Sequence, residues 1–546
     1  MSSYDIVITA DESCMHNYNM SFMAGFLSCT PRDLMPQSVV SYIEKKFFSE
    51  APTQDGKAQV AILSLRKIEA YLSELGFHVV VTSPQSAHKF DAPLYLLSTM
   101  DPLGLGPATT TMMGLTGGKL SFNHYFFQQL VSRIKSTHTH AKVMAGGPGI
   151  WEFEILPEEQ AKMKVDCLFF GAVEGSPKEF WEAAVKGIAP PVYKNKNIRP
   201  DPLPIKGPSF WGMVEISRGC GRGCQFCDFE LMSGFKWIPK DFILKEVAVN
   251  AASPLVSTIT LLSEDTLRYG TQIREWKPNG KIVELVKEIK KFNLDLSFTH
   301  CCLATALANP EVTEAFSHEA GLSEKKLTGF QTGIESGSPR IVRRYMQGKL
   351  KPWEPEDWPE VVQQGMAIMV DNYIIPHATL VMGLEGETSD DVMKTIELVD
   401  SLHHYPSVIL PLFFVPLSIL KERAFTVGLL KQEHKELLAT CAKHTAKWAR
   451  RLPNWSGSLG FADRFVFTAG AAYSFQCLDE LSTGKKKSTA RKFAAAASVA
   501  LKSHLIGAEE VDYWQKTKRS YPVVSKIDRS GGFCPSLPMV SSEIEQ

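Results

Sequence analysis

The sequence contains no run of about 18 consecutive apolar residues, the length that a membrane span requires. It also lacks an excess of either charge, because 59 lysines and arginines are balanced by 59 aspartates and glutamates. That balance gives no electrostatic reason to expect nucleic acid or an anionic membrane as a partner. The first residues lack the basic start and apolar stretch of a signal peptide. We therefore expect a cytoplasmic protein that binds neither nucleic acid nor membrane.

Cysteine is scarce, with 11 in 546 residues, yet Cys220, Cys224 and Cys227 all lie in the stretch SRGCGRGCQFCD at 217–228. In a reducing compartment, such a cluster is more typical of metal binding than of disulfides. No fourth cysteine lies nearby, whereas a structural zinc site takes four ligands. Three thiolates on a cluster of four irons would leave one iron open to a substrate or cofactor. The alternatives are a zinc site completed by a distant His or Cys, and a redox thiol group.

Strand-like and helix-like segments alternate along two parts of the chain. The first part predicts a doubly wound parallel sheet, in which ligands bind at the carboxyl ends of the strands. The second part contains six strand–helix units, which favour an open, partial barrel with its chemistry at the loops that follow the strands. The predicted fold is therefore α/β, with a sheet domain at 1–190, a proline-rich linker at 191–210, a partial barrel at 211–428 and a mainly helical region at 429–546.

The first domain lacks the G-x-G-x-x-G pattern of dinucleotide sites. Its glycines instead follow two late strands, in the stretches AGGPG and GAVEG. Small residues at strand ends let a large planar ligand, or its nucleotide tail, lie close to the backbone.

The cysteine triplet, with Phe226 before its last member, resembles the signature of the radical S-adenosylmethionine (SAM) enzymes. The resemblance covers residues 211 to about 425. It implies a [4Fe–4S] cluster held by Cys220, Cys224 and Cys227, whose open iron binds SAM and whose electron cleaves it to a 5′-deoxyadenosyl radical. The SAM contacts that it implies at the strand ends are Phe226, Ser263, Glu264, Asp265, Glu335, Ser336, Gly383, Phe414 and Val415. A Glu–Ser pair at a strand end is also typical of a helix cap.

The N-terminal sheet resembles the Rossmann-like cobalamin-binding domain that precedes many radical SAM methyltransferases. The cobalamin contacts implied are Ser98, Thr99, Asp101, Gly146, Gly147, Gly171 and Glu174. The Asp-x-His-x-x-Gly motif, whose histidine binds cobalt from below, is absent, and the chain reads MDPLGLGP at 100–107. The lower face of cobalt is then unligated or is capped by His16, Tyr18 or Asp101. The alternative is a sheet module with no cofactor.

Together these resemblances imply a cobalamin-dependent radical SAM C-methyltransferase that methylates an unactivated sp³ carbon. Stretches such as THCCLATALANPE are similar to the methanogen enzymes that methylate a glutamine Cα of methyl-coenzyme M reductase, which implies a protein or peptide substrate and an external electron donor. The region after 430 would border the substrate entrance, with Trp448, Arg450 and Trp455 as contacts or as ordinary helix packing. Cys301 and Cys302 would face substrate or be buried as small apolar residues.

Three other functions remain open at this point. One is a cobalamin-dependent radical SAM cyclase or rearrangement enzyme acting on a small molecule. Another is a methylthiotransferase, which would hold a second cluster with three N-terminal cysteines; the N-terminal domain offers only Cys14, Cys29 and Cys167, far apart in the sequence. The third is a non-enzymatic iron–sulfur or zinc binding module. No catalytic acid or base is identified from the sequence.

Overall fold

The computed structural model describes residues 4–17, 22–197, 203–227, 234–417, 420 and 423–451, and the single positions 473, 476, 477, 480, 491, 492, 495 and 498. Most of the predicted C-terminal helical region lies outside the described residues. Tyr18, Trp455 and the side chain of Arg450 lie outside them as well.

The N-terminal part is built on a six-stranded sheet in the order β4-β1-β5-β6-β7-β8, with every neighbouring pair parallel. The strand order reverses between β1 and β5, which makes this point the topological switch point of a doubly wound sheet. The predicted α/β fold class is confirmed. The strands are β1 (Ile6–Ala10), β4 (Val79–Val81), β5 (Leu94–Ser98), β6 (Lys142–Gly146), β7 (Cys167–Phe170) and β8 (Val192–Lys194).

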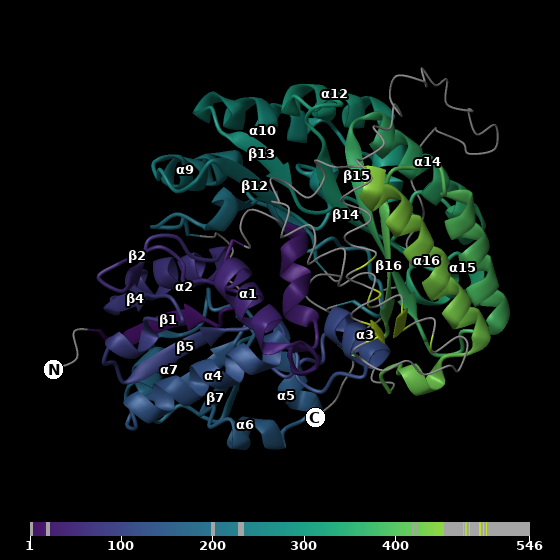
Figure 1. Ribbon diagram of the computed structural model, residues 1–546. Helices are drawn as coiled ribbons and strands as arrows, with labels where there is room; N and C mark the ends of the chain where they lie inside the picture. Colours follow the sequence, from purple (N-terminus) through teal and green to yellow (C-terminus); the bar gives the residue numbers. More distant parts are fainter. Residues whose placement is uncertain are drawn as a thin grey trace, which may run out of the picture.

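Alternate residues of the strands feed two apolar layers, because successive side chains of a strand point to opposite faces. Ile6 and Ile8 pack in one layer, against α2 (Leu63–Glu74) and α7 (Lys178–Val185). Val7 packs in the other layer, which includes α4 (Phe122–Thr137) and α5 (Glu152–Ile155). The sheet is therefore covered by helices on both faces (Figure 1). The remaining elements of this part are η2 (Phe22–Cys29), η3 (Arg32–Leu34), α1 (Gln37–Phe47), β2 (Thr53–Gln54), β3 (Lys57–Ala58), η4 (Ala87–Lys89), α3 (Pro107–Thr116), η5 (Pro148–Trp151) and α6 (Glu158–Lys162).

The start of the predicted linker is a strand of this sheet rather than a free connection. β8 pairs with β7, and the Leu168 N–H donates to the Pro191 carbonyl at 2.8 Å. Beyond the strand, the Asn195 side chain donates to the Ala172 carbonyl at 2.6 Å. Proline is tolerated here because β8 is an edge strand.

The second part is a partial barrel of six strands in chain order, which confirms the expected architecture. β9, β12 and β13 form one parallel group, and β14, β15 and β16 form another. A single parallel bridge, His300 to Gln331, joins the two groups. The strands are β9 (Met213–Glu215), β12 (Thr258–Leu262), β13 (Asp295–Phe298), β14 (Thr328–Glu335), β15 (Ile374–Met382) and β16 (Val408–Phe413), with a small hairpin of β10 (Ser217–Arg218) and β11 (Lys236–Trp237) beside β9.

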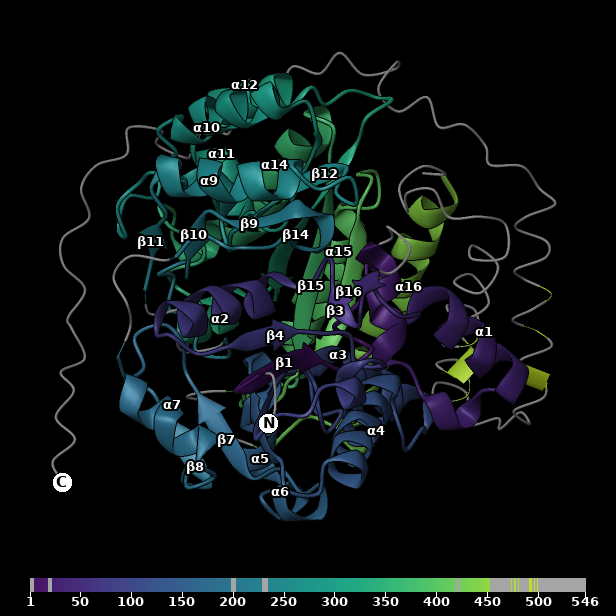
Figure 2. The same ribbon diagram turned by 90° about the vertical axis from the view of Figure 1, so that its left-hand side faces the viewer.

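Helices form the outer layer of the barrel (Figures 1 and 2). They are α9 (Lys240–Ala251), α10 (Lys281–Ile289), α11 (Leu303–Ala308), α12 (Pro310–Ala320), α13 (Pro339–Tyr345), α14 (Trp358–Asp371), α15 (Ser389–Ser401) and α16 (Gln432–Arg451), with 3₁₀ turns η6 (Phe210–Gly212), η7 (Thr266–Arg268), η8 (Lys290–Phe292), η9 (Pro355–Asp357) and η10 (Val427–Leu429). α16 covers the edge strand β16, where the Thr445 hydroxyl bonds both backbone groups of Ile409 at 3.0 and 3.1 Å. Covering an exposed edge protects it from pairing with another chain.

Buried contacts on two sides join the sheet part to the barrel part. Lys67 on α2 forms a buried ion pair with Glu246 on α9. On another side α3 lies against β16, and the Phe413 N–H donates to the Thr111 hydroxyl at 2.8 Å (Figure 1). Because both contacts are buried, the two parts hold a defined orientation.

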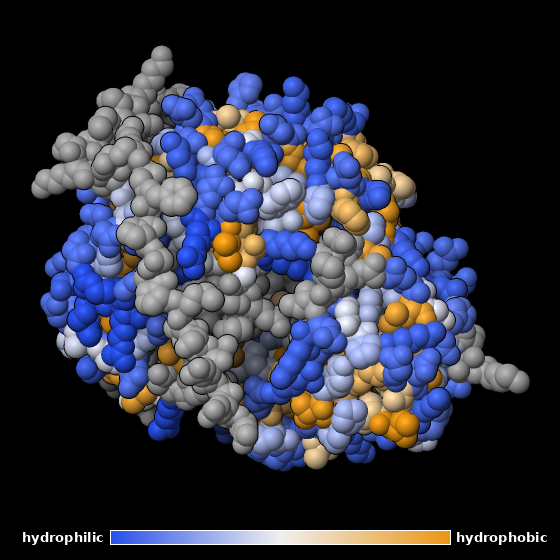
Figure 3. Space-filling model, turned by 180° about the vertical axis from the view of Figure 1, so that it is seen from behind, coloured by the Kyte–Doolittle hydropathy of each residue, from blue (hydrophilic) through white to orange (hydrophobic). Residues whose placement is uncertain are grey.

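The surface seen from behind is mostly hydrophilic, with hydrophobic residues in separate groups (Figure 3). Among the described residues, no helix combines the length and the apolar composition that crossing a membrane requires.

Candidate active site

The three cysteines lie on a tightly wound loop, residues 219–227, which we call the cysteine loop. Gly219, Gly221 and Gly223 have φ values of 68°, 66° and 70°. A side chain at these left-handed positions would be strained, so the alternating glycines are needed for this backbone path. The β10–β11 hairpin holds the start of the loop beside β9.

The thiols of the cysteine loop are shielded from solvent to different degrees. Cys224 is buried, and Cys220 and Cys227 are half-buried. Burial raises the pKa of both Cys220 and Cys224, so each keeps its proton until a metal displaces it. In the part of the chain that the structure describes, no three His, Cys, Asp or Glu side chains are gathered closely enough to hold a metal ion. The donor set nevertheless fits an iron–sulfur cluster, because cysteine thiolates are its usual ligands.

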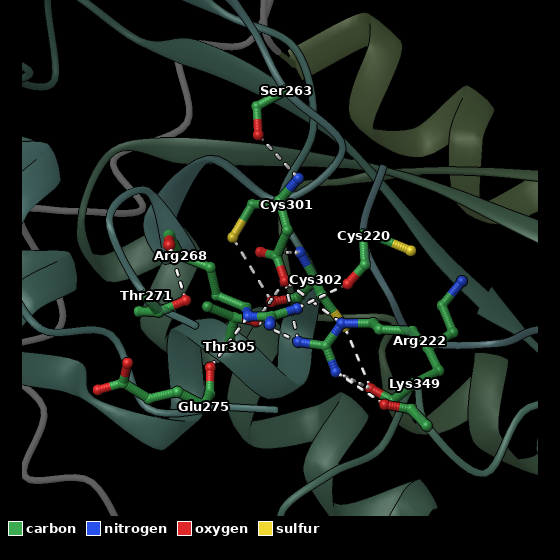
Figure 4. Close-up of polar contacts among 12 residues, drawn as sticks. Cys220, Arg222, Ser263, Arg268, Thr271, Glu275, Cys301, Cys302, Thr305 and Lys349 are labelled. Carbon is green, nitrogen blue, oxygen red and sulfur yellow. Dashed lines mark hydrogen bonds and ion pairs between the residues drawn. The ribbon is translucent and has the colours of Figure 1, made fainter. Parts of the chain in front are cut away.

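Two buried arginines hold the cysteine loop in place (Figure 4). Arg222, within the loop, pairs with Asp265 at 2.9 Å and donates to the carbonyls of Gly348 and Lys349 at 3.0 and 2.9 Å. Arg268 donates to the Cys220 carbonyl at 2.8 Å. Neither arginine was identified from the sequence. Arg222 stands inside the cysteine motif, which was the available signal; Arg268 gives none, because its partner is 48 residues away.

The three polar residues after β12 have different roles. The Ser263 hydroxyl lies 2.6 Å from that of Ser217 and accepts the Asp265 N–H at 3.1 Å, so it ties two strand ends together. Asp265 pairs with Arg222 and also accepts from the Thr305 hydroxyl at 2.7 Å. Glu264 is half-buried, and its negative charge acts on the Cys220 thiol. Of the three, Glu264 is therefore the side chain best placed for a SAM contact.

Glu335 ends β14 in an unusual backbone conformation. Its φ is 62°, which is strained for a residue with a side chain. An ion pair with Lys349 and a hydrogen bond from the Thr379 hydroxyl at 3.3 Å fix its carboxylate. A Cβ at Gly333 would lie 1.7 Å from the Glu335 Oε1 atom, so the pair depends on glycine beneath it. Strain of this kind is typical of functional sites.

Ser336 has a structural role in the local fold. Its hydroxyl accepts the Ser338 N–H at 3.1 Å at the start of α13, and its carbonyl accepts the Trp358 indole N–H at 3.0 Å. These bonds fix the turn that leads into α13 but form no helix cap, because the N-cap residue of α13 is Ser338.

Backbone groups of Phe414 and Val415, which were expected to contact the adenine of SAM, form hydrogen bonds within the chain instead. The Phe414 N–H donates to the Met382 carbonyl and the Phe414 carbonyl accepts the Phe425 N–H, both at 2.9 Å. The Val415 carbonyl accepts the Leu417 N–H at 2.9 Å. The Phe425 ring also fills the space beside Gly383, where a Cβ would meet it at 2.1 Å. SAM would therefore have to displace Phe425 to reach these predicted positions, whereas Phe226 packs half-buried against the barrel core beside the cysteine loop.

Cys301 and Cys302 lie behind the cysteine loop, with exposed fractions of 1% and 7%. Cys302 donates its N–H to Asp265 at 3.2 Å and its S–H to the Lys349 carbonyl at 3.3 Å. Both positions match the expectation of buried small residues. Trp448 is 2% exposed, which favours helix packing over a substrate contact.

The carboxyl edge of the N-terminal sheet is closely packed at its switch point. Ser98 ends β5 and Thr99 follows it, and the Thr99 N–H donates to the Gly146 carbonyl at 2.9 Å. A Cβ at Gly147 would lie 2.8 Å from the Thr99 carbonyl oxygen. Among the described residues the Thr99 hydroxyl is buried without a hydrogen-bond partner, and Met100 beside it is 60% exposed. A buried hydroxyl lacking a partner at a switch point fits a bound cofactor tail.

Asp101 is fully engaged by its own loop. Its carboxylate accepts the Gly106 N–H at 2.9 Å, the Asn123 amide at 2.8 Å and the Thr109 hydroxyl. It therefore anchors the stretch before α3. His16 Nε2 lies 3.1 Å from the Ser49 hydroxyl, and burial lowers the pKa of His16 to about 4.

The two remaining predicted cobalamin residues contact other parts of the chain. A Cβ at Gly171 would lie 2.6 Å from the Asn195 carbonyl, so the segment after β8 covers this glycine. Glu174 pairs with Arg218 on β10 at 2.7 Å. Burial alone would raise the pKa of Glu174, but the Arg218 charge outweighs it and the pKa is lowered. The β7 end of the sheet is thus connected to the base of the cysteine loop.

Comparison with known proteins finds a family match within the barrel part. Residues 214–399 match the Radical SAM superfamily. The ribosomal protein uS12 methylthiotransferase RimO of Thermosipho melanesiensis is 26% identical over 190 residues, which is 35% of this chain and 41% of that protein. The tRNA-2-methylthio-N(6)-dimethylallyladenosine synthase of the same organism is 23% identical over 224 residues, 40% of this chain and 49% of that protein. The similarity thus spans less than half of each of these relatives.

One solved structure resembles the chain over a longer stretch. It is the radical S-adenosylmethionine methyltransferase TsrM from Kitasatospora setae, with cobalamin and a [4Fe–4S] cluster bound. The two share 12% identity and a TM-score of 0.47, over 77% of each chain. The superfamily match begins within β9, includes the cysteine loop and ends in α15. Residues 214–399 of this chain therefore form a radical SAM domain.

Proposed function

We propose that the protein is a cobalamin-dependent radical SAM methyltransferase that acts on an sp³ carbon of a protein or peptide. The observation that carries the proposal is the placement of the two predicted cofactor sites. The carboxyl edge of the N-terminal sheet faces the radical SAM domain, since Glu174 after β7 pairs with Arg218 and α3 after β5 packs against β16. A cofactor at the switch point would then share one space with the cysteine loop.

In this proposal, the cluster with SAM supplies a 5′-deoxyadenosyl radical and cobalamin supplies the methyl group. Cys220, Cys224 and Cys227 would hold the cluster, and Glu264 and Glu335 would contact SAM. Ser98, Thr99, Gly146 and Gly147 would border cobalamin, with the Thr99 hydroxyl as a hydrogen-bond donor.

The residues of the chain mainly orient the reactants and exclude water. Arg222 and Arg268 fix the cysteine loop through backbone carbonyls. The Met100 side chain beside the switch point is 60% exposed, so it leaves an apolar group accessible there. Positioning of this kind replaces side-chain acid–base catalysis, because the cofactors carry the chemistry.

The test is anaerobic reconstitution followed by iron and corrinoid analysis of the purified chain. We expect about four irons and one cobalamin per chain, as one [4Fe–4S] cluster requires. A chain that binds the cluster but takes up no corrinoid would overturn the cobalamin part of the proposal. Zinc bound in place of iron would overturn all of it.

A methylthiotransferase is the second candidate, because the matched relatives carry that activity. Such an enzyme would need a second cluster in the N-terminal part. Cys14 and Cys29 are far apart in the sequence, but the negative charge of Asp101 contributes to a raised pKa of both thiols, so both lie near Asp101. Cys167 is buried in β7, and no group of three ligands forms among the described residues. About eight irons per chain, rather than four, would favour this candidate.

We further propose a polypeptide substrate, with the glutamine of methyl-coenzyme M reductase as the specific case. Incubating the reconstituted protein with a peptide of that sequence and labelled SAM, and locating the label by mass spectrometry, tests it. Transfer of the label to a carbon supports the proposal; transfer only to a small molecule overturns it.

A further inference from the structure

A set of three cations lies around the cysteine loop, and one of them has no carboxylate partner. Arg222 pairs with Asp265 at 2.9 Å, and Lys349 pairs with Glu335. Arg268 has no salt-bridge partner among the described residues. Glu264, a half-buried third carboxylate whose charge acts on the Cys220 thiol, forms no ion pair with Arg268 among these residues.

Arg268 is the most enclosed member of the set, with an exposed fraction of 0%. Its guanidinium donates only to backbone carbonyls, those of Cys220 and Ile273 at 2.8 Å and those of Gln272 and Glu275 at 3.2 Å. Carbonyl dipoles satisfy its N–H groups but do not neutralise its charge.

Aromatic rings complete the enclosure of Arg268. The Phe235 and Trp276 ring centroids lie 4.4 and 4.6 Å from the guanidinium carbon. Burial, and then the neighbouring Arg222, lower the pKa of Arg268 to about 10, which still leaves it charged at neutral pH. A fold that buries a permanent cation without an anion bears a large desolvation cost.

The anion that would offset this cost is the metal-loaded cysteine loop itself. Arg268 is bonded to the backbone of Cys220, and Figure 4 shows the guanidinium groups of Arg268 and Arg222 converging beside this loop. A [4Fe–4S] cluster held by three thiolates carries net negative charge, which grows when the cluster accepts an electron. A fixed cation nearby therefore stabilises the reduced form more than the oxidised form.

We propose that Arg268 is the counter-ion of the cluster, and that its charge raises the reduction potential at which the cluster accepts an electron. The inference rests on the proposed function, because it requires the cysteine loop to hold a [4Fe–4S] cluster. Arg268 is a positioning residue in this role, since it acts through the cluster and not on the substrate.

The experiment is a potentiometric titration of the reconstituted full chain without SAM, with reduction by titanium(III) citrate followed by EPR. Arg268→Gln removes the charge and Arg268→Lys keeps it. Arg343→Gln is the control, since Arg343 pairs with Glu356 on the exposed surface. We expect Arg268→Gln to lower the equilibrium constant for reduction at least tenfold, about 59 mV for one electron, while Arg268→Lys and Arg343→Gln stay close to wild type.

Each outcome decides the question. An unchanged potential in Arg268→Gln with an intact cluster overturns the inference. If Arg268→Gln assembles no cluster, assembly in Arg268→Lys supports a charge requirement, whereas loss in both variants overturns the counter-ion role in favour of a steric one. A wild-type chain that assembles no [4Fe–4S] cluster contradicts the proposed function instead.

Discussion

The barrel mouth around the cysteine loop and the carboxyl edge of the N-terminal sheet bury ionisable groups of opposite kinds. The mouth buries Arg268, a cation with no salt-bridge partner among the described residues. The sheet edge buries acids instead, namely Asp11, Glu12 and Glu152. Burial raises the pKa of all three, and brings that of Asp11 to about 7. Arg133, 3.2 Å from Glu12, is the cation paired with this group of acids.

The difference shows that burying a carboxylic acid and burying a guanidinium have different consequences for whether a charged ligand is expected nearby. A buried carboxylic acid avoids its desolvation cost by keeping its proton, so the sheet edge requires no counter-ion. A guanidinium keeps its charge throughout the physiological range, so an anion bound nearby would stabilise the unpaired Arg268. Charge therefore argues for a bound group at the cysteine loop, while at the sheet edge the argument rests on the Thr99 hydroxyl and the strand order.

The largest effect is expected from Cys224→Ala, which removes a cluster ligand from the mouth. Iron content and 5′-deoxyadenosine formation should fall to background, while circular dichroism of the sheet stays native. Cys441→Ala is the matched control, because Cys441 is also a buried cysteine but lies on α16, away from the loop. SAM cleavage that survives in the Cys224 variant would contradict the assignment of the loop.

At the sheet edge, Asp11→Asn should change how stability depends on pH. The folded Asp11 has a pKa of about 7 against an ordinary value of 3.8, so the native state holds its proton more tightly than the unfolded state. Wild-type stability should then fall as pH rises from about 4 to 7, by up to about 4 kcal/mol. The amide of the variant does not titrate in this pH range, so the stability of the variant should depend much less on pH. Its oxygen still accepts the Ser13 N–H, so the variant should keep the native turn. Parallel stability curves in urea at pH 5 and 8 would show that Asp11 does not carry the effect.

A smaller effect separates two neighbours at the end of β14. Glu335→Gln leaves Lys349 without its carboxylate and adds positive charge to the mouth. We expect SAM affinity to weaken about tenfold, which is about 1.4 kcal/mol. Ser336→Ala removes only a hydroxyl that bonds within the turn before α13, so SAM affinity should hold. Calorimetric titration with SAM measures the affinity of both variants. Equal losses of SAM affinity in Glu335→Gln and Ser336→Ala would mean that Glu335 makes no specific contact with SAM.

The smallest effect is expected where the two regions meet. Glu174→Gln breaks the pair with Arg218, but Arg218 keeps Glu215 at 2.7 Å and is one-third exposed. We expect a change in unfolding free energy of about 1 kcal/mol or less. Added salt should reduce the difference between wild type and variant further. A loss of several kcal/mol, independent of salt, would show that this pair is the main link between the parts.

Alternating strands and helices were enough to predict both sheets, because long periodic segments specify their own local structure. The strand β8 was missed because VYK is short and is preceded by prolines, and only the free edge of β7 makes it a strand. Local pattern carries no information about which edge a short segment will join.

The cysteines of the site were predictable because their spacing is local, whereas the groups around them were not. Arg268 reaches the Cys220 carbonyl and the 272–275 turn, which only the folded chain brings together. The role of Asp101 likewise depends on Asn123 and Thr109, neither of which forms a motif with it. The sequence thus indicates the candidate ligands but not the residues that hold their loop in place.

The α3–β16 contact has a consequence for how the two parts of the molecule fit together. The Phe413 ring lies 3.2 Å from where a Cβ of Gly114 would stand, so a larger residue there would crowd this ring. Glycine at position 114 therefore lets a helix of the first part lie directly against the last strand of the barrel, and a bulkier substitution would disturb both parts at once.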